Sequence, residues 1–399
     1  MEKGWNLNLI NWFERIVGKG NVSEEEIDKL VYSTDASQIK GETRLVVWPK
    51  NAEEIHKIVL FAKRNKTNLV IRGAGTGLVG GCVPKNEVIM DLSKLNKILN
   101  TSEYERSVIV QAGVVLNNLN LRLKKLKLFF PVIPSSHKAC TIGGMIATNA
   151  VGIRAIKYGR VEDWVKALEI IDGTGRLRRI KGEEIKDFCG KEGTTGIILR
   201  AKLKLNDLPE KRSLDIFKFE DEELEELIEK VRELKDEGVS AIEFINAGAA
   251  KIAGLEELNH LIIEYEDFRG EFKEENEIEK IWKMREGILT KINSKEYSVS
   301  EDPKLPLDKL IDFLYWLKNN NIPAFGHIGV GIIHPHFKRN SEKIEEMFEI
   351  VKKLNGEISG EHGIGLLKKK HVNPEVLKEI KELKEKYNPD NIINGGKIC

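Results

Sequence analysis

The feature that most constrains the fold is a glycine-rich loop directly after a short hydrophobic strand. The strand is predicted over residues 68–72, and the loop has five glycines within residues 73–81. Gly75, Gly77 and Gly80 match the pattern G-x-G-x-x-G, but a Rossmann site needs a helix immediately after this loop. A proline and a β-like run follow instead. The loop therefore predicts either close backbone approach to a phosphate in another fold or an ordinary tight turn.

A second segment of small residues favours the ligand-binding interpretation. It extends over residues 131–152 and is rich in Gly, Ala, Ser, Thr and Asn. Such a backbone lets a large flat ligand lie against main-chain groups, while the hydroxyl and amide side chains supply hydrogen bonds. Two separate segments of this kind suit a dinucleotide.

Glycine and histidine are distributed unevenly along the chain. Residues 1–206 contain 20 of the 34 glycines, residues 207–325 contain five, and residues 326–399 contain nine. Five of the eight histidines lie in the last 73 residues. Flexible glycine backbone is therefore concentrated in the N-terminal half of the chain, and imidazole side chains are concentrated near the C-terminus.

The order of predicted elements indicates an α+β fold with more than one domain. Short strands alternate with a helix in the first half, which ends near a break at residues 206–209. Charged amphipathic helices with β-like runs between them then suggest a different domain. Strand-like runs are predicted at 45–48, 68–72, 88–92, 108–111, 153–172, 197–205, 241–245 and 260–265, and helices at 52–65, 221–235, 274–291, 307–319 and 374–387.

Composition excludes several classes of protein. The net charge of +1 gives no single-signed field for nucleic acid, and 41% hydrophobic residues argue against disorder. The four cysteines lie far apart without a C-x-x-C pair, which excludes a disulfide framework and an iron–sulfur motif. No apolar stretch of about 18 residues or secretory segment occurs, so we expect a cytoplasmic protein that reaches a membrane only through a partner. Charged residues make up 32% of the chain and glutamine is scarce, a compositional bias that is typical of proteins from hyperthermophiles.

Two strings near the C-terminus contain the candidate chemical groups. The first holds His327, His334 and His336, and the second holds Glu361 and His362. Two imidazoles and a carboxylate suit a divalent metal such as Zn²⁺, with positions left open for substrate oxygens. Glycines and β-branched neighbours favour strand and turn over helix, which would place His334 and His336 on one face. A lone histidine is more often a surface residue or a hydrogen-bonded packing residue, and we leave His336 and His371 to one of these structural roles.

The chain resembles a known family of flavoproteins. The runs VVWPKNAEEIHKIVLFAKRNKTNLVIRGAGTGLVGG, PSSHKACTIGGMIATNAVG and KEGTTGIILRAKLKL are similar to the FAD-binding domain of the vanillyl-alcohol-oxidase (PCMH) type. The C-terminal half resembles the FAD-linked 2-hydroxyacid dehydrogenases, which include D-lactate dehydrogenases, glycolate oxidase FAD subunits and D-2-hydroxyglutarate dehydrogenases. The resemblance implies a two-subdomain FAD-binding domain over 1–206 and an α+β cap (substrate) domain with an antiparallel sheet over 207–370. A C-terminal helix and tail, 371–399, would return to the FAD domain.

The same resemblance implies which residues bind FAD. In the family, the glycine-rich loop wraps the pyrophosphate, the second segment lines the ribityl chain and flavin ring, and the tail returns to the flavin. The family tail usually reads N-P-G-K, whereas residues 394–397 read N-G-G-K, which leaves the shape of this loop open. The matching positions are Arg72, Gly73, Ala74, Gly75, Thr76, Gly77, Leu78, Pro134, Ser135, Ser136, Thr141, Gly143, Gly144, Ala147, Thr148, Asn149, Gly152, Glu192, Gly193, Ile198, Asn394 and Lys397.

The resemblance also implies a mechanism. His327, His334 and Glu361 match the family's metal ligands, and His362 matches its catalytic base. Arg285 matches the arginine that binds the substrate carboxylate; an exposed helix arginine paired with a glutamate is the alternative. The implied reaction oxidises a small 2-hydroxy acid to the 2-oxo acid, with hydride transfer to FAD. Electrons would then pass to an iron–sulfur subunit, a quinone or an electron-transfer flavoprotein, and homo-oligomers are compatible with the sequence.

One departure from the family leaves the activity open. The family usually reads G-H-x-G-D-G-N-x-H, but Val330 and Ile332 replace the Asp and Asn. The loss of two polar groups would change substrate contacts or metal support if they lie beside the flavin. One alternative is an FAD-binding electron-transfer subunit of a larger complex with diminished catalytic activity. Another is a different reaction on the same fold.

Overall fold

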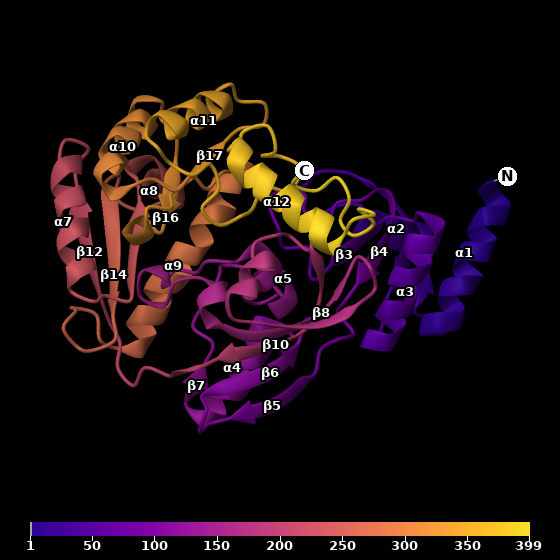
Figure 1. Ribbon diagram of the computed structural model, residues 1–399. Helices are drawn as coiled ribbons and strands as arrows, with labels where there is room; N and C mark the ends of the chain where they lie inside the picture. The colour runs from indigo at the N-terminus through magenta and orange to yellow at the C-terminus, as the bar shows by residue number, and fades with distance from the viewer. Residues whose placement is uncertain (1) are drawn as a thin grey trace.

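The computed structural model describes the backbone of residues 2–399 and the side chains of residues 9–399. The N-terminal half, residues 2–206, carries two large sheets of four and five strands, and the C-terminal half is built on a third large sheet of six strands (Figure 1). The last helix, α12 (Pro374–Tyr387), returns to the N-terminal half, because Tyr387 and the following Ile393 are buried in its hydrophobic core. Helices and sheets occur in both halves of the chain, so the prediction of an α+β fold is confirmed.

The first sheet carries the glycine-rich loop. Its strand order is β1-β2-β4-β3, and β4 pairs in parallel with both β2 and β3. Helix α3 connects β2 to β3; Asn51 caps its first turn by accepting a hydrogen bond from the Glu54 N–H, and its apolar face is buried. The bounds are β1 Val22–Ser23, β2 Glu42–Val47, α3 Ala52–Asn65, β3 Leu69–Arg72 and β4 Lys85–Asp91. The loop after β3 leads into strand β4 and not into a helix, as predicted.

The second sheet is antiparallel and supports the segment of small residues. Its order is β5-β6-β10-β8-β9, and helix α5 packs on β6 and β10. Thr141 caps α5 by accepting a hydrogen bond from the Gly144 N–H at 3.3 Å. The bounds are β5 Ile98–Ser102, β6 Ser107–Gln111, α4 Leu116–Leu123, α5 Ile142–Thr148, β8 Val165–Asp172, β9 Leu177–Lys181 and β10 Gly196–Lys204; two short strands, β7 Leu128–Phe129 and β11 Asn206–Asp207, pair separately.

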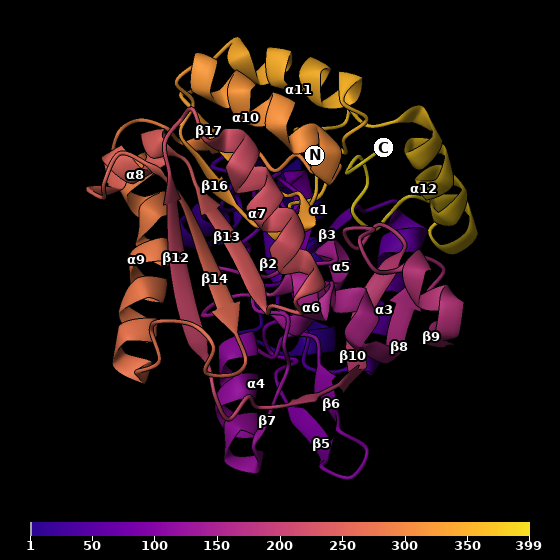
Figure 2. The same cartoon turned by 90° about the vertical axis from the view of Figure 1, so that its left-hand side faces the viewer.

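The third sheet lies between two layers of helices (Figure 2). Alternate residues of its strands face opposite sides, as the period of two requires. Ile242 and Phe244 pack with α7, α10 and α11, whereas Ala241 and Ile245 pack with α8 and α9. The bounds are β12 Ser213–Phe219, α7 Leu224–Asp236, β13 Ala241–Ile245, α8 Ala247–Ala253, β14 Asn259–Tyr265, α9 Glu275–Asn293, β15 Val299–Ser300, α10 Leu310–Asn319, β16 Ala324–Gly326, β17 His334–Phe337 and α11 Lys343–Lys353.

One predicted segment differs from the structure, and one helix was not predicted. The strand predicted over 153–172 begins only with β8; before it lie helix α6 (Ala155–Tyr158) and a 3-10 helix at Val161–Trp164. Gly159, with φ +66°, separates these two turns, so the long apolar run is broken by backbone geometry. Helix α11 was not predicted, although Met347, Phe348 and Val351 form its buried stripe.

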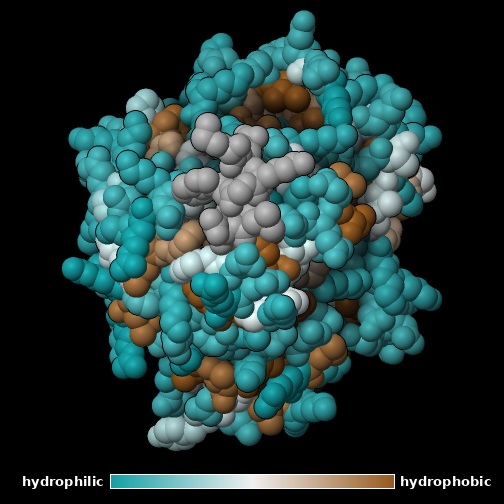
Figure 3. Space-filling model, turned by 90° about the vertical axis from the view of Figure 1, so that its right-hand side faces the viewer, coloured by the Kyte–Doolittle hydropathy of each residue, from teal (hydrophilic) through white to brown (hydrophobic). Residues whose placement is uncertain are grey.

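The surface is largely hydrophilic on the face that carries the N-terminal helices. There, apolar side chains form separate patches (Figure 3). Helix α2 (Glu26–Tyr32) exposes Ile27, Leu30 and Val31. Within the part of the chain that the structure describes, no helix has the length and apolar character needed to cross a membrane.

Candidate active site

The glycine-rich loop forms one wall of a cavity of about 580 Å³. Gly75 has φ +68°, and a Cβ on it would lie 2.3 Å from Nη2 of Arg72, so only glycine fits there. Arg72 itself donates to the Thr34 carbonyl at 2.7 Å, which fixes the guanidinium beside the loop. A Cβ on Gly73 would lie 2.4 Å from Oγ1 of Thr141, so the two glycine-rich segments contact each other.

Most of the residues expected to bind FAD line this cavity. It is lined by Arg72, Gly73, Ala74, Gly75, Thr76, Gly77, Leu78, Pro134, Ser135, Ser136, Thr141, Gly144, Ala147, Thr148, Glu192 and Asn394. A small adjoining cavity of about 60 Å³ adds Gly143, Gly193 and Ile198. Backbone held open by glycine, with hydroxyl groups around it, fits a dinucleotide with a flat ring system.

Three expected residues lie elsewhere. Asn149 ends helix α5 with φ +50° and accepts a hydrogen bond from the Glu162 N–H, and a Cβ on Gly152 would lie 2.7 Å from the Ile133 backbone. Lys397 is buried and donates to the Val83 carbonyl. None of the three lines the cavities described here. Asn394 lines the large cavity but also accepts from the Ile71 N–H at 2.8 Å, which ties the tail to β3.

A second cavity of about 520 Å³ adjoins the first. Its lining includes Arg285, His334, Glu361 and His362. Glu361 and His362 also line the first cavity, so the two spaces meet at these side chains. The structure thus brings the expected base, the expected carboxylate-binding arginine and two of the expected metal ligands to one place.

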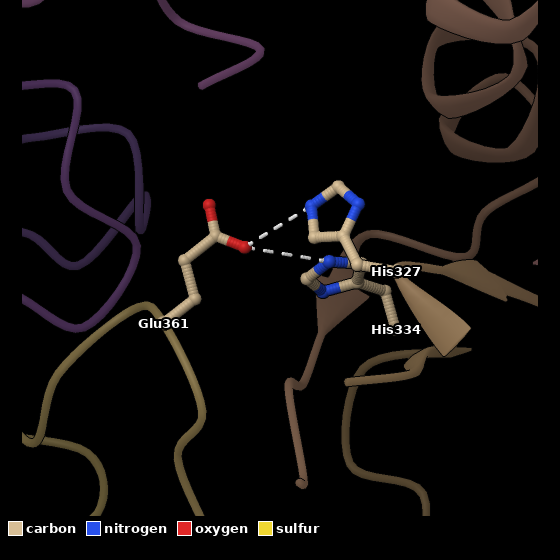
Figure 4. Close-up of side chains that lie close together, drawn as sticks. All are labelled: His327, His334 and Glu361. Atoms are coloured by element: carbon tan, nitrogen blue, oxygen red, sulfur yellow. Dashed lines mark ion pairs between the residues drawn. The ribbon is translucent and has the colours of Figure 1, made fainter. Parts of the chain in front are cut away.

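The expected metal ligands form a compact cluster at this junction. Oε2 of Glu361 lies 3.5 Å from Nε2 of His327 and 3.6 Å from Nε2 of His334 (Figure 4). One ligand atom from each of the three residues falls within 4.8 Å of the others. Oε2 of Glu361 is buried without a hydrogen-bond partner. A buried carboxylate oxygen that faces two imidazole nitrogens fits a divalent cation between them, with a fourth position for substrate.

The protonation of the two imidazoles differs. Burial and the neighbouring His362 and His327 lower the pKa of His334 well below its usual value, which keeps the ring neutral. Burial also lowers the pKa of His327, but the carboxylates of Glu243 and Glu361 outweigh it and raise this pKa to about 9. A cation that binds to His327 therefore has to displace a proton.

Glu243, which the sequence analysis did not single out, connects the arginine to this cluster. Its Oε1 accepts a hydrogen bond from Nδ1 of His327 at 2.5 Å, which fixes the ring so that Nε2 faces Glu361. Its Oε2 accepts from Nε and Nη2 of Arg285 at 2.9 and 2.6 Å. Arg285 is 7% exposed, so it is not the exposed helix arginine of the alternative interpretation. The signal in the sequence is a single carboxylate within the otherwise apolar strand β13.

Asp302 organises the loop that carries Glu361 and His362. Its Oδ2 accepts hydrogen bonds from the N–H groups of these two residues at 2.6 and 2.7 Å. Its Oδ1 lies 3.4 Å from Nδ1 of His362 and pairs with the buried ammonium of Lys368. Burial raises the pKa of Asp302, but the neighbouring His362 ring and the ammonium of Lys368 outweigh it and keep this pKa below its ordinary value. The sequence analysis missed Asp302 and Lys368.

The two substituted residues of the histidine-rich string do not line the cavities. Ile332 is 1% exposed and packs with Val151 and Ala155, and Val330 lies against the same cluster. They fill an apolar contact between the two halves of the chain. Because neither side chain faces the cavities, their positions do not support the interpretation that these substitutions impair substrate or metal contacts.

The two histidines left to structural roles are both buried. His336 is fully buried against Phe325, with ring centroids 4.7 Å apart, and neither ring nitrogen has a hydrogen-bond partner. His371 stacks on Phe348 at 4.1 Å and faces Glu345. Neither of them lines the two large cavities.

Comparison with known proteins identifies the family. Residues 43–181 match the FAD binding domain, and residues 265–398 match the C-terminal domain of FAD linked oxidases. The chain is 30% identical to D-lactate dehydrogenase of Archaeoglobus fulgidus, over 90% of this chain and 92% of that protein. The chain belongs to the FAD-linked 2-hydroxyacid dehydrogenase family. It is an FAD-linked oxidoreductase.

Further members of the family cover the same length. Glycolate oxidase subunit GlcD of Bacillus subtilis is 28% identical, over 96% of this chain and 95% of that protein. D-2-hydroxyglutarate dehydrogenase of Stutzerimonas stutzeri is 26% identical, over 98% of both chains. A solved alkyldihydroxyacetonephosphate synthase is 18% identical with a TM-score of 0.73, over 98% of this chain and 85% of that chain, and it shares the fold.

Proposed function

We propose that this dehydrogenase oxidises a 2-hydroxycarboxylate of D configuration to the 2-oxo acid at the junction of the two cavities. The observation that carries the proposal is that Glu361 and His362 line both spaces. A substrate in the second cavity would therefore lie against a flavin in the first. The relatives named as D-lactate dehydrogenase, glycolate oxidase subunit and D-2-hydroxyglutarate dehydrogenase support this substrate class.

Arg285 would bind the substrate carboxylate. Glu243 engages only Nε and Nη2 of the guanidinium, which leaves the Nη1 donors available for a carboxylate oxygen. The Glu243 contact and the Phe325 ring, whose centroid lies 4.2 Å from Cζ of Arg285, would hold the guanidinium in one orientation. The carboxylate would then be held at a fixed distance from His362.

His362 would accept the proton of the substrate hydroxyl. With Asp302 beside Nδ1, the lone pair of Nε2 would face the substrate, and the carboxylate would stabilise the imidazolium that forms. Bound FAD would supply the acceptor for the α-hydrogen and its electron pair, and a divalent cation on His327, His334 and Glu361 would supply a Lewis acid for the substrate oxygens.

Electrons would leave to a separate acceptor, which we propose is an iron–sulfur subunit, a quinone or an electron-transfer flavoprotein. All four cysteines are free thiols, and the sequence contains no C-x-x-C motif for a cluster. The chain itself therefore offers no cysteine framework for a second electron carrier.

The role of His362 can be tested with a single substitution. In His362→Ala, anaerobic flavin reduction by D-lactate, glycolate or D-2-hydroxyglutarate should fall by at least about 100-fold, because a general base contributes 10²–10⁴-fold. FAD content, measured by absorbance, should stay stoichiometric. The matched control is His56→Ala on α3, which should reduce normally. Unchanged reduction kinetics in His362→Ala would remove this residue from the mechanism, and purified protein with bound FAD that no hydroxy acid reduces would refute the proposed function.

A further inference from the structure

The second cavity is much larger than a small hydroxy acid requires. Its volume of about 520 Å³ lies within the range of about 300–1,000 Å³ typical of sites that enclose drug-sized ligands. Lactate and glycolate, with three and two carbons, would fill only the end beside Arg285 and His362. Exposed Lys124 and Lys138 also line the cavity, so it extends from the junction to the protein surface.

One face of helix α9 forms a wall along this cavity. Ile278, Trp282, Arg285 and Leu289 line it, and their spacing of four, three and four residues places them in one stripe. Leu289 also lines the flavin cavity, whereas Ile278 lies toward the start of the helix. At 1.5 Å per residue, the stripe extends for about 10 Å from Arg285 to Ile278. A substrate held at Arg285 could lay its side chain along this stripe.

Further apolar side chains line the cavity together with its charged groups. Ile133, Ile153 and Phe325 line the same cavity. Ile153 and Phe325 belong to the hydrophobic cluster that contains Ile278 and Trp282. An alkyl or aromatic substrate side chain would therefore exchange water for apolar contacts over much of its length.

Several charged groups on the walls are already paired with one another. Arg154 pairs with Glu264 at 2.5 Å, Lys283 pairs with Glu279 at 3.2 Å, and Arg212 pairs with Glu275. A second carboxylate on the substrate would compete with these glutamates. The cations on the wall without a carboxylate partner are Lys124 and Lys138, which are exposed. This arrangement disfavours a short dicarboxylate such as 2-hydroxyglutarate.

We propose that the second cavity selects 2-hydroxy acids with a long apolar side chain, either alkyl or aromatic. This inference rests on the proposed function, because it names the substrate class of the same site. Arg285 holds the carboxylate, and the side chain lies along Trp282 and Ile278 with Ile153 opposite. The selectivity follows from buried apolar area, since each buried methylene contributes several-fold in affinity.

The test compares three acids on the FAD-loaded enzyme. D-lactate, D-2-hydroxyoctanoate and D-2-hydroxyglutarate are each mixed anaerobically, and the rate of flavin bleaching is measured against concentration. The second-order rate constant for D-2-hydroxyoctanoate should exceed that for D-lactate by at least about tenfold, because it buries five more methylenes. An equal or higher constant for D-lactate or D-2-hydroxyglutarate overturns the inference and leaves the proposed function standing.

Substitutions that fill the cavity localise the effect. Ile153→Phe and Ile133→Phe should each remove most of the preference for the eight-carbon acid, measured as the ratio of the second-order rate constants for D-2-hydroxyoctanoate and D-lactate. The control is Leu121→Phe on the exposed face of α4, which should retain the preference. A preference that survives in both filled variants overturns the placement of the side chain in this cavity.

Calorimetry separates failure of the inference from failure of the proposed function. 2-Oxooctanoate, the product of D-2-hydroxyoctanoate oxidation, should bind the oxidised enzyme with a negative heat-capacity change, and Ile153→Phe should weaken that binding. If no acid reduces the flavin while 2-oxooctanoate still binds in an Ile153-dependent way, the proposed reaction fails and the binding class stands. Absence of both reduction and 2-oxooctanoate binding overturns both.

Discussion

At the scale of single residues, the site depends on charged side chains buried inside apolar surroundings. Glu243 and Asp302 are both 0% exposed, and Lys368 is 1% exposed. Removing such groups from water is costly, so they persist only with paired charges and hydrogen bonds. Here each carboxylate positions a group with a proposed chemical role: Glu243 contacts His327 and Asp302 contacts His362.

The role of Glu243 predicts a loss of metal in Glu243→Gln. The neutral amide of the variant cannot balance the charge of Arg285, and it accepts a hydrogen bond from Nδ1 of His327 less strongly than the carboxylate does. Nε2 of His327 should therefore lose its fixed orientation. Metal affinity should fall by about 10–100-fold, as is typical when the partner of a ligating histidine is removed. Metal content after dialysis against a series of buffered Zn²⁺ concentrations measures this effect independently of activity.

The control is Glu357→Gln, which removes an exposed carboxylate that pairs with Lys304. It should retain its metal. Wild-type zinc affinity in Glu243→Gln, with FAD bound, would show that this carboxylate does not position the ligand.

The site residues that stand in recognisable motifs could be predicted from the sequence, whereas their buried partners without a motif could not. His327, His334, Glu361 and His362 stand in two short strings, and the structure brings them together. Asp302 acts from 60 residues away. No local pattern reports such a partner, because the contact depends on how β15 and the loop after it pack against the C-terminal segment.

At the scale of elements, the antiparallel sheet of the C-terminal half sorts its side chains between two faces. Glu243 on β13 and Glu264 on β14 both lie on the face covered by α9, where they contact Arg285 and Trp282. The bounds of α3, β13 and α12 coincide with those predicted, because each has a strong periodic pattern or a clear cap. The short helices α5 and α6 were missed, since glycine and small residues obscure the helical period there.

Glu264 also joins the two halves of the chain through Arg154. We therefore predict that Arg154→Ala lowers the free energy of unfolding substantially. Arg154 comes from the segment before α6 and donates to Glu264 from Nε and Nη2 at 2.5 and 2.8 Å. Loss of Arg154 leaves the buried carboxylate without its hydrogen-bonded charge partner and with only Arg212 at 3.9 Å, which costs up to about 3–5 kcal/mol. Denaturant unfolding at pH 7 measures the change. As a control, Arg106→Ala removes an exposed ion pair with Asp207 and should lower the free energy of unfolding by less than about 1 kcal/mol.

The same pair gives stability a defined pH dependence. Burial raises the pKa of Glu264, but Arg154 and Arg212 outweigh it and hold this pKa below its ordinary value of 4.5. Because the folded-state pKa is the lower one, the contribution is complete above pH 4.5 and is lost as the pH falls through the folded-state value. Unfolding free energies measured between pH 7 and 3 should fall less steeply in Arg154→Ala. An identical slope in the variant would contradict this assignment.

At the scale of the whole molecule, the hydrophobic cores support the expected division of the chain. One cluster contains buried residues from 9 to 205 together with residues of the C-terminal tail, and two others contain residues from 214 to 358. We therefore propose an FAD-binding domain over 1–206, a substrate domain over 207–370, and a returning segment over 371–399. The cavity lined by the glycine-rich loop, where we propose that FAD binds, lies between them, because Leu289, Glu361 and His362 also line it.

This position predicts that FAD stabilises both domains together. A ligand that contacts both halves and binds only the folded state shifts their unfolding as one unit, by about 2.7 kcal/mol at a hundredfold excess over Kd. Calorimetry of the apoprotein with added FAD should therefore show a single transition that moves to higher temperature. FMN, which lacks the adenine half, should move it less, because it leaves the contacts around Gly193 and Ile198 unmade. A shift confined to one of two separate transitions would place the flavin within a single domain and contradict a cavity shared by both.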